Sequence, residues 1–201
     1  MTCLTRALAL TLALAAGPVL AQQGDAPAAP AAPELSMGQP APEAAAEDGP
    51  GSSYVAATFD AWEQRCVREA DGSDPCQLYQ LLKDAEGNPV AEISLFALPR
   101  AQQAAVAGAT IIVPLETLLP EGLTLAVDGA NPKRYPLTFC APIGCIARVG
   151  FTAEEIEAFR KGATATLSLL PALAPDQRVT LTISLKGFTA GYAAAAATIG
   201  D

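Results

Sequence analysis

From residue 54 onward, short apolar runs alternate with clusters of Gly, Pro, Asn and Asp, a pattern typical of strands joined by tight turns. The clearest run is 178–186, where Val, Leu or Ile fills every second position and would line one face of a strand. The same reasoning predicts nine strands, at 54–62, 76–83, 90–98, 110–114, 123–128, 135–140, 145–149, 163–170 and 178–186. Nine short strands at this spacing indicate an all-β sandwich or barrel.

Two clusters of turn residues separate predicted strands. Residues 86–89 read Glu-Gly-Asn-Pro and residues 128–132 read Asp-Gly-Ala-Asn-Pro. Neither continues a strand easily, because Gly, Asn and Pro each impose their own backbone conformation. We interpret Asp128 as a turn residue whose side chain bonds to its own backbone.

One short helix interrupts the strands. Residues 152–155 (Thr-Ala-Glu-Glu) form a capping box, in which a hydroxyl and a carboxylate each satisfy a free amide at the helix start. Ile156 and Phe159 lie three residues apart on one helix face, and Gly162 is the expected left-handed cap. The alanine run 193–197 is a possible second helix.

The first 21 residues have the pattern of a secretory signal peptide. Arg6 gives a positive start, residues 7–16 are apolar and uncharged, and residues 19–21 end on a small side chain. We therefore predict cleavage after Ala21. The apolar run is shorter than the roughly 20 residues of a membrane-spanning helix, so no transmembrane span is expected after the signal is removed. Cys3 precedes the apolar run and so cannot be the site of lipid attachment.

Residues 22–53 form a linker rich in Ala and Pro, with five acidic side chains and no basic ones. Such a segment has too little apolar surface to offset the entropy of ordering it, so we predict a disordered spacer. The alternative is a proline-rich recognition peptide, which would need a partner domain. The folded domain is expected to cover 54–201.

Composition excludes several function classes. The 201-residue chain has 12 Lys and Arg against 21 Asp and Glu, and it has no His. With a formal charge of −9, the chain has no excess of positive side chains to neutralise the phosphates of a nucleic acid, so nucleic-acid binding is not expected. The absence of His removes Ser-His-Asp and Cys-His nucleophiles and His-containing zinc sites. Because phosphate loops, nucleophile elbows and calcium loops are also absent from the sequence, we predict no catalytic residue, metal site or cofactor.

Four cysteines remain after the signal peptide, and an even number in an exported protein indicates two disulfides. Three connectivities are possible. The economical one joins neighbours, Cys66 with Cys76 and Cys140 with Cys145. Neither spacing matches the Cys-x-x-Cys pattern of redox or metal sites, so we interpret both pairs as structural.

The charged side chains offer few candidates for chemistry. Glu154, Glu155 and Glu157 stand at a helix start, where acidic residues are favourable and usually form a solvated face. Lys133 and Arg134 form a small basic pair that could meet an anionic surface, and we interpret it as a solubilising loop.

The ordered motifs of the domain resemble the invasion-associated locus B family of exported alphaproteobacterial proteins. Four cysteines in order and a closing Ser-Leu-Lys-Gly-Phe motif at 184–188 carry most of the resemblance. The matching segments are Trp62 with Cys66, 76–80, 113–115 with 118–123, 127–129, Phe139-Cys140 with Gly144-Cys145, and 183–190.

This resemblance implies an immunoglobulin-like β-sandwich with two local disulfides, an envelope or periplasmic location and, in pathogenic members, a contribution to host-cell invasion. It implies no enzymatic activity. Our leading hypothesis is a non-enzymatic binding module whose partner is an unidentified envelope or host protein or glycan. The alternative is an envelope-maintenance factor that binds a glycan or periplasmic protein, and a hydrolase comes third. A binding module should expose an apolar patch, whereas an enzyme should show a cleft with perturbed pKa values.

Overall fold

The computed structural model describes residues 48–99 and 104–199. The expected signal peptide and residues 22–47 of the expected linker lie outside this range. The described elements are β1 (Ser53–Phe59), β2 (Trp62–Val67), β3 (Cys76–Lys83), β4 (Pro89–Ala97), β5 (Ala107–Val113), η1 (Leu119–Glu121), β6 (Leu123–Val127), β7 (Ala130–Tyr135), β8 (Phe139–Ala141), β9 (Gly144–Phe151), α1 (Ala153–Lys161), β10 (Thr164–Leu169), β11 (Val179–Ser184) and α2 (Phe188–Ala196).

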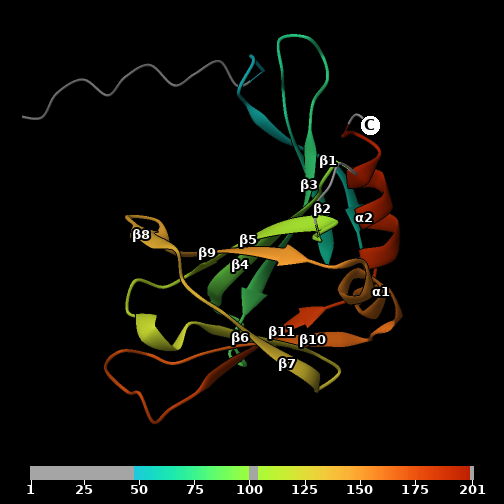
Figure 1. Cartoon of the computed structure of the whole chain (residues 1–201). Helices are drawn as coiled ribbons and strands as arrows, with labels where there is room; N and C mark the ends of the chain where they lie inside the picture. The colour runs from blue at the N-terminus through green and yellow to red at the C-terminus, as the bar shows by residue number, and fades with distance from the viewer. Residues whose placement is uncertain (1–47, 100–103, 200–201) are drawn as a thin grey trace, which may run out of the picture. The chain divides into compact units, whose positions relative to one another are not determined.

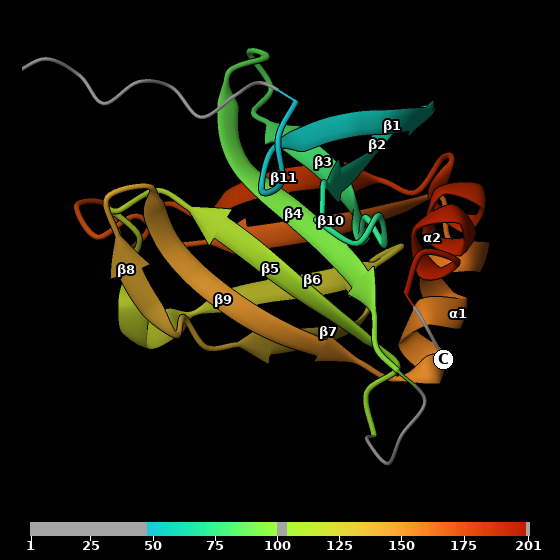
Figure 2. The same cartoon turned by 90° about the horizontal axis from the view of Figure 1, so that it is seen from above.

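Two antiparallel sheets form a sandwich, which confirms the predicted fold class. One sheet has seven strands in the order β1-β2-β3-β4-β5-β9-β8, and the other has four in the order β11-β10-β6-β7. Figure 2 shows β4, β5 and β9 in front and the four-stranded sheet behind them. The chain crosses between the sheets after β5, β7 and β9, and after β11 it enters α2, which contacts β2, β3 and β4 of the seven-stranded sheet.

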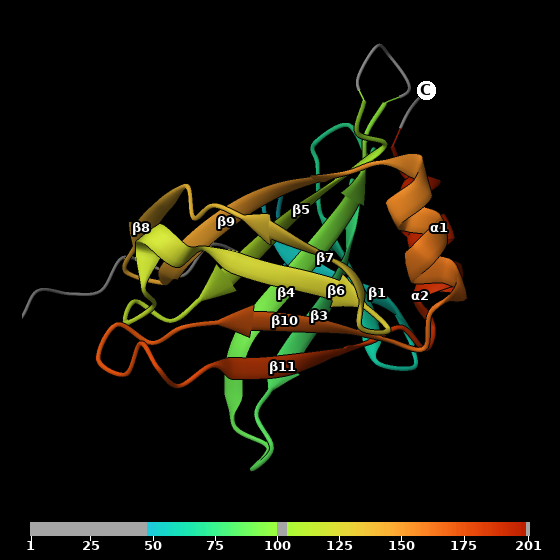
Figure 3. The ribbon, with the colours of Figure 1, turned by 60° about the horizontal axis from the view of Figure 1, so that its bottom comes forward.

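The two ends of the sandwich differ (Figures 1 and 3). Helices α1 and α2 lie together at one end, which we call the helix end. The β8–β9 hairpin, η1 and the β10–β11 connection lie at the opposite end, which we call the loop end. The two ends therefore present different surfaces, one covered by helices and one formed by loops.

Aromatic rings fill the core beneath the helices. Phe188 contacts both Trp62 and Phe159, with ring centroids 5.6 and 5.3 Å apart, and Phe159 contacts Phe151 at 5.2 Å. All four side chains are at most 1% exposed. Aromatic pairs at such distances contribute roughly 0.5–1.5 kcal/mol each beyond the area that they bury. Both helices are thus held to the sheets by large, fully enclosed side chains.

Backbone groups of Ser184 connect the end of β11 to the seven-stranded sheet. The indole Nε1 of Trp62 donates to the Ser184 carbonyl at 2.8 Å, and the Gln80 Nε2 donates to the same oxygen at 3.0 Å. The Ser184 N–H in turn donates to Gln80 Oε1 at 2.9 Å. Gln80 is buried, so this pairing satisfies polar groups that would otherwise be costly inside the core.

The predicted strand 54–62 is wrong at its end. The chain reverses at Asp60, whose φ of 52° is left-handed, and Trp62 begins a separate strand, β2, that pairs back on β1. The run 62–67 alternates large and polar residues, but its charged residues and Cys66 obscured the pattern in the sequence.

The predicted break at 128–132 is also wrong in part. Asp128 and Gly129 form the turn, but Asn131 and Pro132 already belong to β7. Proline is compatible with this strand because β7 is at the edge of its sheet, where a missing N–H need not interrupt a ladder.

Both predicted helices are present, with one correction to a cap. Thr152 and Glu155 make the full capping box of α1, and Ile156 and Phe159 are its buried residues. Gly162 is not a left-handed cap, because its φ of −74° and ψ of 158° are extended and lead directly into β10. The C-terminal helix α2 begins at Phe188, earlier than the predicted alanine run.

Both disulfides join sequence neighbours. Cys66 and Cys76 face each other across β2 and β3, and Cys140 and Cys145 face each other across the β8–β9 hairpin. The Cα atoms are 4.0 Å apart in each pair. One disulfide therefore ties two strands of the main sheet, and the other closes a hairpin at the loop end.

Candidate functional site

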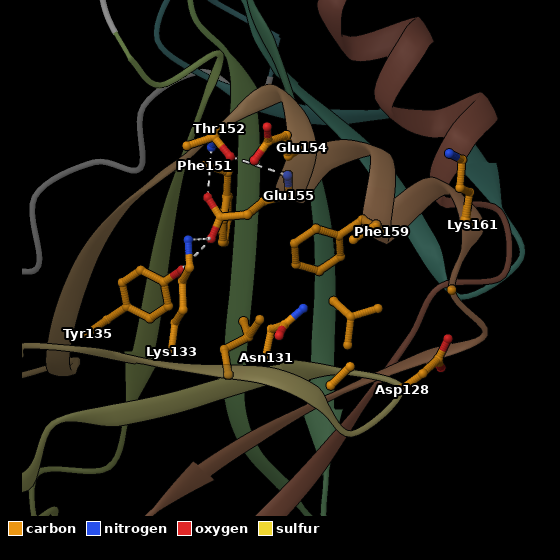
Figure 4. Close-up of a pocket in the computed structure, with 15 residues that line it drawn as sticks. Asp128, Asn131, Lys133, Tyr135, Phe151, Thr152, Glu154, Glu155, Phe159 and Lys161 are labelled. Carbon is orange, nitrogen blue, oxygen red and sulfur yellow. Dashed lines mark hydrogen bonds and ion pairs between the residues drawn. The ribbon is translucent and has the colours of Figure 1, made fainter.

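A pocket lies between α1 and the β6–β7 hairpin (Figure 4). Its volume is about 440 Å³, within the range of small-molecule sites. Apolar side chains form the floor: Leu125 comes from β6, Phe151 from the end of β9 and Phe159 from α1. Each is at most 5% exposed, so these residues serve the core as well as the pocket.

A carboxylate with three donors stands at one end of the pocket. Glu155 Oε1 accepts from Lys133 Nζ at 2.7 Å and from the Tyr135 hydroxyl at 3.1 Å. Its Oε2 accepts from the Thr152 N–H at 2.8 Å. Figure 4 shows Lys133 and Tyr135 reaching up from β7 to meet Glu155 on the first turn of α1. The interaction therefore links the helix to the second sheet.

The pKa values of Glu155 and Tyr135 are shifted away from neutral pH in opposite directions. Burial alone would raise the pKa of Glu155, but hydrogen bonds from Lys133, Thr152 and Tyr135 outweigh it and the pKa is lowered. Burial, followed by the charge and hydrogen bond of Glu155, raises the pKa of Tyr135. Glu155 thus stays ionised and Tyr135 stays protonated near neutral pH, so neither exchanges a proton readily there.

These positions correct two interpretations of the sequence. Glu155 is not part of a solvated face, because its side chain is only 19% exposed and makes three bonds. Lys133 and Arg134 belong to strand β7 rather than to a loop, and they form ion pairs with Glu155 and Glu121. No sequence pattern indicated this contact, because β7 was not predicted and Lys133 and Glu155 are 22 positions apart.

The opposite end of the pocket is shaped by the β6–β7 turn. The Asp128 carboxylate accepts from the N–H groups of Ala163 and Thr164, on the segment entering β10, at 3.0 to 3.2 Å. These bonds lower the pKa of Asp128. Asp128 is thus a turn residue, but its side chain bonds to the neighbouring strand rather than to its own turn. The bonds fix the position of the turn that leads into β7.

Five large apolar side chains are exposed at the loop end, and we call them the apolar end. They are Leu115 at 55% exposure, Leu119 at 48%, Phe139 at 44%, Ile143 at 70% and Leu173 at 86%. Exposed leucines are common singly, but a group of them marks a candidate interaction surface.

Backbone hydrogen bonds hold the loops of the apolar end together. Leu118 N–H donates to the Leu170 carbonyl at 2.7 Å, and Ala172 N–H donates to the Glu116 carbonyl at 2.6 Å. Thr117 is buried and its hydroxyl donates to the Pro114 carbonyl at 2.7 Å. The apolar end is therefore displayed on ordered, mutually bonded loops.

Across residues 48–99 and 104–199, no three His, Cys, Asp or Glu side chains gather as a metal centre would require. The helices of the described chain include none long and apolar enough to cross a bilayer. The four cysteines singled out in the sequence are all in disulfides, so none is a free thiol.

Known proteins are similar to this chain in sequence and in fold. The family model described as invasion associated locus B (IalB) protein matches residues 62–196. Invasion protein B homologues from two strains of Brucella abortus are 28% identical over 141 residues, covering 70% of this chain and 78% of theirs. The crystal structure of invasion associated protein B from Bartonella henselae matches with a TM-score of 0.58 and 21% identity, covering 69% of this chain and 92% of that one. The structural likeness at this identity is a likeness of fold.

Proposed function

Because the chain belongs to the invasion-associated locus B family, we propose that it is an exported, non-enzymatic binding protein of the cell envelope. The observation that carries this proposal is the apolar end. Its five side chains are 44–86% exposed, yet the loops and the hairpin that carry them are held by backbone hydrogen bonds and a disulfide. An apolar surface of this kind is stabilised when a partner protein covers it.

The geometry of the pocket supports a binding role over a catalytic one. A catalytic acid or base works best with a pKa near the operating pH. The pKa of Glu155 is lowered and that of Tyr135 is raised, so both move away from that range. Lys133 is held by Glu155 as an ion pair, which leaves a stable electrostatic bridge rather than an activated group.

The proposed partner is a protein of the envelope or of a host cell. Relatives bear the name invasion protein, and a role in host contact would suit an apolar surface presented at one end of the domain. A glycan partner, the alternative, would be expected to stack on exposed rings. All of the one Trp, four Tyr and six Phe lie in the described residues, and among them only Phe139 has an exposed ring, at 44%.

Crosslinking in intact cells tests the surface. A photoreactive amino acid at Ile143 or Leu173 should give a discrete crosslinked species, whose partner can be identified by mass spectrometry. The same amino acid at Thr182, on the outer face of β11, serves as the matched control. Equal crosslinking at all three positions, or none at Ile143 and Leu173, would contradict the proposal.

Export is tested at the N-terminus of the mature protein. We propose cleavage after Ala21, so N-terminal sequencing of protein from the envelope fraction should begin at Gln22. Recovery of a chain that retains Met1 would remove the basis for a periplasmic location.

A further inference from the structure

We propose that the partner surface continues from the apolar end onto the outer face of the seven-stranded sheet, where Arg148 selects a partner protein that presents a carboxylate beside large apolar side chains. This inference rests on the proposed function, because it specifies the chemistry of the partner that the apolar end contacts. Figure 2 shows the outer face, with β4, β5 and β9 in front.

A row of side chains crosses the outer face close to the apolar end. We call it the outer-face row, and cross-strand pairing gives its members in the order Leu81, Glu92, Ile112, Ile146 and Phe139. Leu81 is 42% exposed and Phe139 is 44% exposed, whereas Ile146 contributes little surface, at 9%. The charged member, Glu92, accepts from the Tyr79 hydroxyl at 2.9 Å. Phe139 also belongs to the apolar end, so the two surfaces share a residue.

A groove joins the outer-face row to the apolar end. Ile143, which is 70% exposed at the tip of the β8–β9 hairpin, lines this groove together with Leu81 and Ile112. Two exposed prolines, Pro89 and Pro114, also line it. The groove has a volume of about 190 Å³, below the roughly 300–1,000 Å³ of small-molecule sites, so it suits a single apolar side chain of a protein partner.

Arg148 lies beside this apolar surface, on the outer face of β9. Its side chain is exposed, and its guanidinium carbon is 5.7 Å from the centroid of the Phe139 ring. Among the described residues, no carboxylate lies within ion-pair distance of Arg148. Arg65, on the same face, is paired with Glu63 at 2.8 Å. Arg148 thus offers a positive charge that the domain itself leaves without a carboxylate.

The contact between Arg148 and Phe139 determines what a partner must supply. A partner that covers Phe139 also covers Arg148, and burying a charge without a counter-charge is costly. The partner therefore needs a carboxylate at this point, where it can form a bidentate pair with the guanidinium. Because the chain has 21 Asp and Glu against 12 Lys and Arg, a carboxylate is disfavoured over most of its surface and favoured at Arg148.

The test extends the crosslinking of intact cells to the outer face. A photoreactive amino acid at Leu81 should trap the same partner as one at Ile143. The same amino acid at Val55, which is 53% exposed on β1, is the matched control and should not trap it. Mass spectrometry of the crosslinked peptides should locate, in the partner, an Asp or Glu beside large apolar side chains.

The charge at Arg148 is tested in the chain that carries the photoreactive amino acid at Ile143. Arg148→Glu should lower the yield of crosslinked partner at least fivefold, whereas Arg148→Lys, which keeps the charge, should stay within about twofold. Arg178→Glu reverses another exposed cation, next to the start of β11, and should also stay within twofold. Replacing the located carboxylate of the partner by Lys should restore crosslinking to Arg148→Glu. Melting within a few degrees of the natural chain establishes that each variant is folded.

Several results would overturn this inference and leave the proposed function intact. They are crosslinking at Ile143 without crosslinking at Leu81, equal crosslinking at Val55, an undiminished yield in folded Arg148→Glu, and failure of the charge swap to restore the yield. A crosslink from Leu81 to lipid or to a second copy of this chain would also overturn it. If Ile143, Leu173 and Leu81 all gave no crosslink, the proposed function and this inference would fail together.

Discussion

The helix end and the loop end of the sandwich use apolar residues in opposite ways. At the helix end, Phe151, Phe159 and Phe188 are enclosed by two helices and both sheets. At the loop end, Ile143 and Leu173 project from connections that nothing in the described domain covers. The first arrangement stabilises the fold, whereas the second leaves hydrophobic surface in water.

Under the proposed function, this difference separates residues that stabilise the fold from residues that contact a partner. The loops of the apolar end are not loosely built, because backbone bonds join 116–118 to 170–172 and a disulfide closes the β8–β9 hairpin. A rigid support under exposed apolar side chains lowers the entropy lost when a partner binds. We therefore expect mutations at the two ends to separate folding from binding.

The largest effect on stability is expected from the buried aromatic side chains at the helix end. Phe159→Ala should lower the free energy of unfolding by about 3–5 kcal/mol, because it removes a fully buried ring and leaves a cavity. Leu173→Ser at the loop end should change it by no more than about 0.5 kcal/mol, as exposed substitutions usually do. Urea denaturation of the two variants measures both values. Similar losses of unfolding free energy in the two variants would contradict the difference between the two ends.

Removal of either disulfide should cause the next largest loss in the free energy of unfolding. Replacing Cys66 and Cys76 together by Ser should cost about 3 kcal/mol, and replacing Cys140 and Cys145 should cost about 2 kcal/mol, because the second pair closes a shorter loop. Thermal and urea unfolding give the two values. Peptide mapping without reduction should recover the same two pairs, and crossed pairs would contradict the local connectivity.

A smaller, pH-dependent effect is expected from Glu155. Its pKa is lowered in the folded chain, so its contribution to stability is present above the unfolded pKa and is lost as pH falls through the folded value. Below about pH 4.5, the natural chain should therefore lose melting temperature more steeply than Glu155→Gln. Glu154→Gln, at the neighbouring exposed position, should follow the natural chain. If the melting temperatures of all three chains fell equally as the pH is lowered, the Glu155 cluster would not be coupled to folding.

The smallest effect is expected at the N-terminal boundary. Residues 48–52 turn against the end of β2, where Gly51 N–H and the Arg68 carbonyl are 2.7 Å apart and Arg68 N–H donates to Ser52. A chain beginning at Asp48 should melt within a few degrees of the mature protein, since ~1 kcal/mol shifts a domain of this size by only a few degrees. A chain beginning at Tyr54 loses the turn and should melt slightly lower. A large drop for the first chain would show that residues 22–47 stabilise the domain.

The sequence predicted the elements whose pattern is local. Strand β11 has strict alternation, and the capping box at Thr152 needs only four residues. Strand β7 was missed because Pro132 is compatible with a strand only at a sheet edge, a position that the whole topology decides.

The pocket was beyond sequence reasoning for the same reason. Glu155 was correctly placed at a helix start, but its bonds to Lys133 and Tyr135 depend on α1 lying over β7. The apolar end depends likewise on three loops that meet only in the folded sandwich. Local patterns specified the strands and caps, whereas exposure and long-range pairing required the structure.

The contacts of Ser184 constrain when the domain can fold. Trp62 and Gln80, early in the domain, complete their hydrogen bonds only with a residue more than 100 positions later, and α2 then covers Leu78. Contacts this distant in sequence delay productive folding until the loop between them is closed. On the proposed export route, the chain emerging from a translocation channel stays incomplete until its last strand and helix are released. The nascent chain would therefore be exposed to proteases and chaperones for nearly the whole passage, and folding would follow release rather than accompany it.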